Sequence, residues 1–170
     1  MVGKIIVSPL NDLSRVLSEI RADFVISLLG PSDKIAFPKV ASKNLLQLNF
    51  DDAGVSTNQL IAPSKADIEK ILSFSRAWGG VGNFVVHCKA GTSRSPAAAM
   101  IAAASINRPD VAAKVGKGRP YFRPNRTMLR LADEIFAQEC RMEHGLVALE
   151  ASIVRPDKPT DVRACAVAVR

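Results

Sequence analysis

The chain has 170 residues, 48% of them hydrophobic, and carries a formal net charge of +7. This length suits one domain with a sizeable core, and the hydrophobic content excludes general disorder. The positive charge favours anionic partners, but one Trp and one Tyr leave little material for base stacking, so we expect no nucleic-acid role.

Strand-like runs alternate with helical patterns along the first part of the chain. Strands are predicted at residues 4–8, 23–29, 44–50 and 83–87, and helices at 11–20 and 64–78. In the second of these helices Ser64 and Asp67 form a capping pair. The alternation predicts an α/β fold with a mostly parallel central sheet of about four to five strands, flanked by helices on both sides.

The third predicted strand ends in two adjacent carboxylates. Leu46, Leu48 and Phe50 share one face of this strand, and Asp51 and Asp52 follow directly. Aspartate close to glycine is also ordinary turn chemistry, so either residue could simply open a loop. In an open α/β sheet, however, the carboxyl ends of the strands form the crevice in which ligands bind.

Residues 87–95, HCKAGTSRS, stand between a predicted strand and a predicted helix. The apolar run at 83–86 follows a glycine-rich stretch, and an Ala-rich helix occupies 95–106, with Pro96 near its first turn. In the order strand, loop, helix, the N–H groups of the loop and of the helix N-terminus converge on one point. The stretch therefore predicts an anion site formed by the main chain.

Particular residues of this loop suit phosphoryl chemistry. Cys88 and Arg94 are separated by five residues, and the nearby donors and positive charge favour the thiolate form of Cys88, which is a nucleophile for phosphorus. Arg94 supplies a planar fork that can grip two phosphate oxygens. Gly91 lets the loop turn tightly, Ser95 can donate its hydroxyl to the sulfur, and His87 is expected to fix the loop through its ring donors.

The alternatives to a reactive site are packing and metal binding. A cysteine is often only a small buried hydrophobe, and the spacing of Cys88 and Arg94 alone arises easily by chance. Cys140 and Cys165 have no CxxC partners, and His144 is the only other histidine, which argues against a zinc site. The loop sequence and its flanks, taken together, favour an active site.

The sequence HCKAGTSRS resembles the signature loop of the cysteine-dependent protein tyrosine phosphatase superfamily, and the compact chain resembles its dual-specificity branch. The resemblance implies a two-step reaction: Cys88 takes the phosphoryl group, an aspartic acid protonates the leaving oxygen, and the same aspartate then activates water. It also implies that no metal or cofactor is needed. The phosphate-binding residues would be Lys89, Ala90, Gly91, Thr92, Ser93 and Arg94.

The family pattern places the acid upstream, on a loop that follows a strand. A small polar residue and then Asp, after an apolar strand, matches Asp52 better than Asp51, so Asp52 is the predicted general acid and base. The interval to Cys88 is slightly longer than we expect for the dual-specificity branch, which leaves Asp51 as the alternative.

A basic loop and a long helix follow the candidate site. The sequence RPYFRPN leads into a helix predicted at 125–144, with Asn125 as its N-cap. This segment also resembles the closing part of dual-specificity domains. We therefore predict a dual-specificity-like phosphatase domain at residues 1–145 and a C-terminal tail or appended element at 146–170.

Three functions follow from these observations. The leading hypothesis is a phosphatase for phosphotyrosine, and in the dual-specificity case also for phosphoserine and phosphothreonine. HCKAG also resembles the loops of phosphoinositide and other phospholipid phosphatases, in which a residue like Lys89 helps hold the head group, but Thr92 stands where those enzymes typically have a second basic residue. The third hypothesis is a binding module that captures phosphoproteins without turnover.

The cysteine content bears on location. Three cysteines without framework spacing favour a reducing compartment, and the apolar run near the N-terminus is too short for a signal peptide. We expect a cytoplasmic protein. The sequence does not indicate an oligomeric state.

Overall fold

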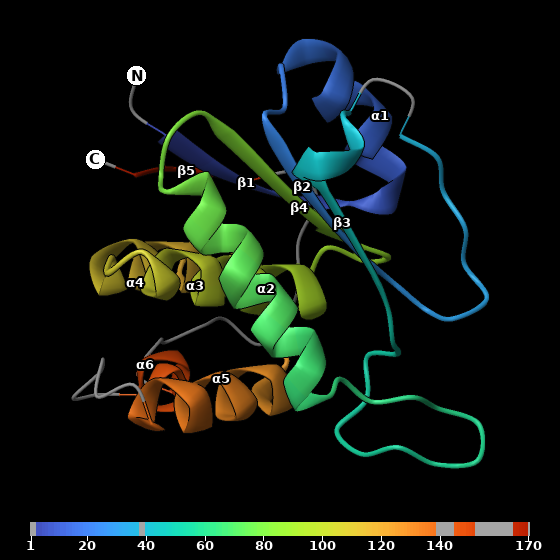
Figure 1. Ribbon diagram of the computed structural model, residues 1–170, viewed down its shortest axis with the longest axis vertical. Helices are drawn as coiled ribbons and strands as arrows, with labels where there is room; N and C mark the ends of the chain where they lie inside the picture. The colour runs from blue at the N-terminus through green and yellow to red at the C-terminus, as the bar shows by residue number, and fades with distance from the viewer. Residues whose placement is uncertain (1–2, 38–39, 139–144, 152–164, 170) are drawn as a thin grey trace.

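The computed structural model describes residues 3–37, 40–138, 145–151 and 165–169 (Figure 1). The elements follow in the order β1 (Gly3–Pro9), α1 (Leu10–Glu19), β2 (Phe24–Leu29), the 3-10 turn η1 (Ser42–Asn44), β3 (Leu45–Asn49), α2 (Lys65–Trp78), β4 (Asn83–Cys88), α3 (Arg94–Ser105), α4 (Pro109–Gly116), α5 (Arg126–Gln138), α6 (Leu146–Ala151) and β5 (Cys165–Val169). The predicted alternation of strands and helices is confirmed.

A five-stranded sheet with the order β3-β2-β4-β1-β5 forms the centre of the molecule. The pairs β2–β3, β2–β4 and β1–β4 are parallel, and β5 runs antiparallel to β1 at one edge. The prediction of a mostly parallel sheet is therefore confirmed. Because parallel neighbours end at the same side, the chain segments after β2, β3 and β4 meet at one edge of the sheet.

Helices cover both faces of the sheet, as predicted, but unequally. Helix α1 lies on one face, whereas α2 to α6 lie on the other (Figure 1). Strand β4 shows why two cores form: Phe84, Val86 and Cys88 belong to the larger core on the α3 side, and Val85 belongs to the smaller core under α1. Alternate residues of a strand point to opposite faces, so one strand supplies both layers.

Helix α3 is the central helix of the larger layer. All twelve of its residues are buried, and half of them are alanines. Small side chains allow the sheet on one side and the neighbouring helices on the other to approach α3 closely. The N-terminus of this helix, which carries the candidate loop, is thus held rigidly by its surroundings.

Local signals set the ends of α2 as expected. Ser64 and Asp67 form the predicted reciprocal capping box, and Gly79 ends the helix in the left-handed region with φ 63°.

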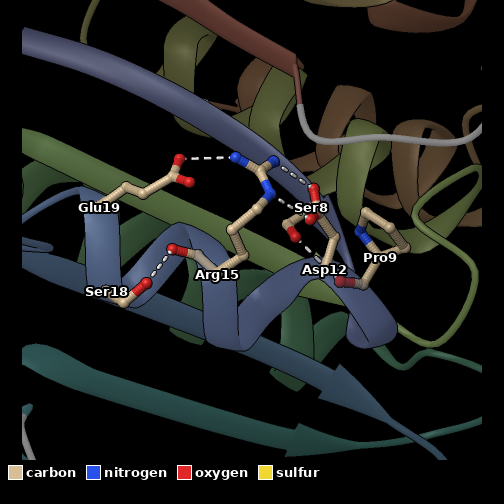
Figure 2. Close-up of polar contacts among 6 residues, drawn as sticks. All are labelled: Ser8, Pro9, Asp12, Arg15, Ser18 and Glu19. Carbon is tan, nitrogen blue, oxygen red and sulfur yellow. Dashed lines mark hydrogen bonds and ion pairs between the residues drawn. The ribbon is translucent and has the colours of Figure 1, made fainter.

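On α1, Arg15 donates to both Asp12 and Glu19 along the exposed face (Figure 2). These ion pairs lie on the exposed side of α1 and include no residue of the candidate site.

The segment assigned to a tail supplies two elements that pack on the domain. The Leu146 N–H and the Val147 N–H both donate to the carboxylate of Asp133, which fixes the start of α6 against α5. Strand β5 adds to the sheet beside β1. The last residues of the helix predicted at 125–144 lie outside the described residues. Among the residues that the structure describes, no helix is long and apolar enough to cross a membrane.

Candidate active site

The candidate residues gather at the carboxyl edge of the parallel strands. Strand β4 ends at Cys88, which is in register with Pro9 of β1 and Leu28 of β2. The segment with Asp51 and Asp52 begins one residue after Phe50, at the end of β3. The strand order therefore brings the two predicted parts of the site to the same edge.

The loop after Cys88 is folded tightly against the end of β1. Gly91 has φ 71°, and a Cβ atom there would lie 2.7 Å from the backbone nitrogen of Pro9. Only glycine meets both conditions without strain. At the same junction the Ser8 hydroxyl donates to the Pro9 carbonyl (Figure 2), and the Leu10 N–H donates to the Lys89 carbonyl at 3.1 Å. The loop is thus anchored to the start of α1.

The sulfur of Cys88 lies inside this loop and receives polar contacts from both sides. The Gly91 N–H donates to Sγ at 3.2 Å, and the Ser95 hydroxyl lies 3.2 Å from Sγ. Cys88 itself is buried. The sequence predicted a contact between Ser95 and the sulfur, and the structure places the two side chains within contact distance.

Helix α3 begins at Arg94 and leaves its first N–H groups directed at the loop. Within the described part of the chain, the side chain of Ser93 at the N-cap makes no capping hydrogen bond and donates instead to Asp52. Because no capping side chain among the described residues takes up the N–H groups at this end of α3, these groups are available to bind an anion.

Arg94 links the two halves of the site. Its Nη1 donates to the Phe50 carbonyl at 2.7 Å, just before the two aspartates, and the residue is 6% exposed. Among the residues that the structure describes, its buried Nε has no partner. A buried donor without a partner is costly, so an anion bound in the loop would satisfy it.

Asp52 is held over the loop by two donors. The Ser93 hydroxyl and the Asn125 Nδ2 both donate to its Oδ1, at 2.7 and 2.8 Å. Asn125 also accepts the Met128 N–H through Oδ1 at 3.0 Å, so its predicted role as the N-cap of α5 is confirmed. Its contact with Asp52 was not predicted, because nothing local in the sequence connects residues 73 positions apart.

Asp51 has a different position from Asp52. Its N–H donates to the Ile61 carbonyl at 2.6 Å, and its Oδ2 accepts the Ile61 N–H at 2.9 Å. These two bonds close the loop at 51–61 at its base. The carboxylate of Asp51 is thus used within its own loop, whereas that of Asp52 contacts Ser93 in the loop that follows Cys88.

His87 points away from Cys88, to the α1 face of the sheet. It is fully buried, and its ring packs against Phe37 with the ring centroids 5.7 Å apart. Burial lowers the pKa of His87 to about 4; a hydrogen bond with the Cys88 backbone acts against this shift, and the positive charge of Arg94 adds to it. The expected support of the loop through the ring donors of His87 stays a prediction.

The remaining loop residues are held through their backbone or are exposed. The Thr92 carbonyl accepts the Arg123 N–H at 2.8 Å, and the Ser93 carbonyl accepts the Asn125 N–H at 3.2 Å. Ala90 is exposed. In the described ranges no group of three or more His, Cys, Asp and Glu side chains is placed to hold a metal ion.

No family model matches the chain, and no curated protein sequence matches it. Solved structures do match. DUSP15 is 18% identical over 91% of this chain and 99% of its own, with a TM-score of 0.60. PTP-2 phosphatase of Cydia pomonella is 16% identical over 75% and 83%, with a TM-score of 0.55. PTPMT1 is 21% identical over 81% and 95%, with a TM-score of 0.52. The predicted fold is confirmed: this chain has the dual-specificity phosphatase fold.

Proposed function

We propose that the protein hydrolyses phosphomonoesters, with phosphotyrosine as the first substrate to test, through a phosphocysteine on Cys88. The observation that carries this proposal is the loop itself. The sulfur receives the Gly91 N–H and lies beside the Ser95 hydroxyl, and the buried Arg94 keeps a donor without a partner among the described residues. A phosphate in the loop would satisfy that donor and the N–H groups at the start of α3.

In the first step the Cys88 thiolate attacks phosphorus and the bond from phosphorus to the ester oxygen breaks. The leaving oxygen takes a proton from Asp52, which Ser93 and Asn125 hold on the same side of the site as the loop. Arg94 grips the phosphoryl oxygens and compensates the charge that develops on them.

In the second step the Asp52 carboxylate removes a proton from water, and the water oxygen attacks phosphorus. The sulfur–phosphorus bond breaks, which releases inorganic phosphate and returns the thiolate and protonated Asp52. The Ser95 hydroxyl, 3.2 Å from Sγ, stabilises the departing sulfur. The cycle needs no redox partner.

Substitution of the nucleophile tests the proposal. Cys88→Ser is expected to abolish hydrolysis of para-nitrophenyl phosphate while the protein still binds phosphotyrosine peptide. Hydrolysis at the wild-type rate in Cys88→Ser would contradict the mechanism. Binding without any hydrolysis by the wild type would favour a phosphoprotein-binding module instead.

Matched variants distinguish the two aspartates. Asp52→Ala should lower kcat for substrates with poor leaving groups by about 100-fold or more, the range measured for general acids. Asp51→Ala loses only the bond that closes its own loop, so we expect a much smaller effect on kcat and a lower melting temperature. The reverse order of the two kcat values would assign the acid to Asp51.

A further inference from the structure

The one lysine of the phosphate loop is already paired with a carboxylate. Lys89 Nζ lies 3.6 Å from Asp33 Oδ1. Asp33 belongs to the turn after β2, where its N–H donates to the Gly30 carbonyl at 3.0 Å and its Oδ2 accepts the Gly30 N–H at 3.2 Å. The turn therefore fixes the carboxylate beside Lys89.

A second carboxylate stands next to Asp33. A Cβ atom at Gly30 would lie 3.2 Å from both Asp33 Oδ2 and Asp51 Oδ1. Asp51 is fixed in turn by its two bonds to Ile61. We call Asp33 and Asp51 the acidic ledge. Asp33 thus pairs with the Lys89 ammonium group, and Asp51 adds a second carboxylate beside Asp33, on the other side of Gly30.

The surface on which a substrate could extend next to Lys89 is otherwise neutral. A depression of about 420 Å³ is lined by Pro9, Leu10, Asn11, Lys89 and Ala90. None of these residues is acidic, and Lys89 is the only charged one. Because Asp33 offsets that charge, the depression suits an uncharged group beside the reacting phosphate.

We infer that the acidic ledge sets the charge preference of the site: it admits phosphomonoesters whose neighbouring groups are neutral or basic and disfavours those with a second negative group near Lys89. This inference rests on the proposed phosphatase function. A second anion would have to displace Asp33 from Lys89 and then face both carboxylates. At exposed sites such charge interactions change affinity by about 3- to 10-fold and weaken with salt.

The test is a set of phosphotyrosine peptides that differ only in the residues flanking the phosphotyrosine. Peptides with Gln, Lys or Glu at these positions are compared by kcat/KM at low and high salt, with an inositol bisphosphate as a small polyanion. The wild type should favour the Gln and Lys peptides over the Glu peptide by about 3- to 10-fold at low salt. Preference for the Glu peptide or for the bisphosphate would overturn the inference.

Variants then assign the preference to named residues. Asp33→Asn keeps an oxygen that can accept the Gly30 N–H but removes the charge, so the discrimination against Glu should fall to about twofold or less. Adding Lys89→Met to Asp33→Asn removes the freed ammonium and should restore part of the discrimination. Glu134→Gln on α5 changes the net charge by the same amount at a distant exposed position, and should leave the peptide ratios unchanged. Equal ratios in wild type and Asp33→Asn would contradict the role of the ledge.

Failure of the inference can be told apart from failure of the proposed function. Hydrolysis of para-nitrophenyl phosphate reports the phosphatase activity alone. If it is present while the three peptides react equally, only the ledge is refuted. If hydrolysis is absent, the binding of the same three peptides to Cys88→Ser and to Cys88→Ser/Asp33→Asn is measured by calorimetry. Equal affinities of Cys88→Ser for the three peptides would then refute the role of the ledge as well.

Discussion

Replacing Asn125 separates two functions that one side chain combines. Its Oδ1 accepts the Met128 N–H at the start of α5, and its Nδ2 donates to Asp52 at 2.8 Å. Asn125→Asp keeps an acceptor for the cap but loses the donor and adds a negative charge beside Asp52. Asn125→Ala loses both contacts. Ser93→Ala removes the other donor to Asp52 and leaves the cap intact.

The expected effects on stability follow from the cap. Loss of an N-cap costs about 1 kcal/mol in the free energy of unfolding, so Asn125→Ala should lower the melting temperature by about 2–4 °C. Asn125→Asp keeps the cap, because aspartate caps helices as well as asparagine does, so we expect any loss of stability in this variant to come from repulsion between its carboxylate and that of Asp52. The stability of both variants is measured by urea denaturation and differential scanning calorimetry.

The expected effects on catalysis follow from the contact with Asp52. A general acid typically raises the rate of the chemical step by about 100- to 10,000-fold, and a misplaced one loses part of this effect. We therefore expect each of Asn125→Asp, Asn125→Ala and Ser93→Ala to reduce kcat for phenyl phosphate by about 5- to 50-fold, with less effect on a substrate whose phenol leaves readily. If Asn125→Asp folds normally and hydrolyses phenyl phosphate at the wild-type rate while Asp52→Ala does not, the positioning role is wrong.

Three further predictions concern the loop and its support. Because burial lowers the pKa of His87 from 6.5 to about 4, the unfolded chain binds a proton in this range that the folded chain does not. The stability that the neutral His87 contributes should therefore be fully present above pH 6.5, and the free energy of unfolding should fall by up to about 3 kcal/mol as the pH is lowered to 4. Urea denaturation of wild type and His87→Gln measures this fall. An equal loss of stability in both proteins would contradict the prediction. Gly91→Ala should destabilise the chain and abolish binding of phosphotyrosine peptide, because its Cβ would clash with Pro9, whereas Gly54→Ala, with its nearest contact at 3.7 Å, should be tolerated in thermal melts. Ser95→Ala should slow breakdown of the phosphoenzyme more than its formation, so that rapid-quench kinetics show a burst of phenol; a steady rate with no burst would argue against its role toward the sulfur.

Local patterns were sufficient for much of the fold. The capping box at Ser64 and the apolar run of β4 are encoded within a few residues, and the structure has both where the sequence predicts them. Strand β5 was not predicted. Its partner β1 lies at the other end of the chain, and pairing between such distant segments leaves no local signal.

The candidate site likewise has parts that the local sequence predicts and parts that it does not. The loop from His87 to Ser95 is continuous in sequence, so its turn and the contact of Ser95 with the sulfur were predictable from spacing. The support of Asp52 comes from Asn125 on another element, and only the packing of α5 against the loop brings them together. His87 shows the limit of residue type as a guide, because strand alternation turns its ring to the opposite face from Cys88.

The central claim is that a phosphoryl group passes through the sulfur of Cys88. The most direct measurement is to mix the wild type with phosphotyrosine peptide, quench in acid within the first turnovers, digest the protein and locate phosphate by mass spectrometry. We predict one phosphate on the peptide that contains Cys88, with more of it trapped in Asp52→Ala and Ser95→Ala. Turnover with phosphate on another residue, or with no phosphoenzyme in any of the three proteins, would contradict the account.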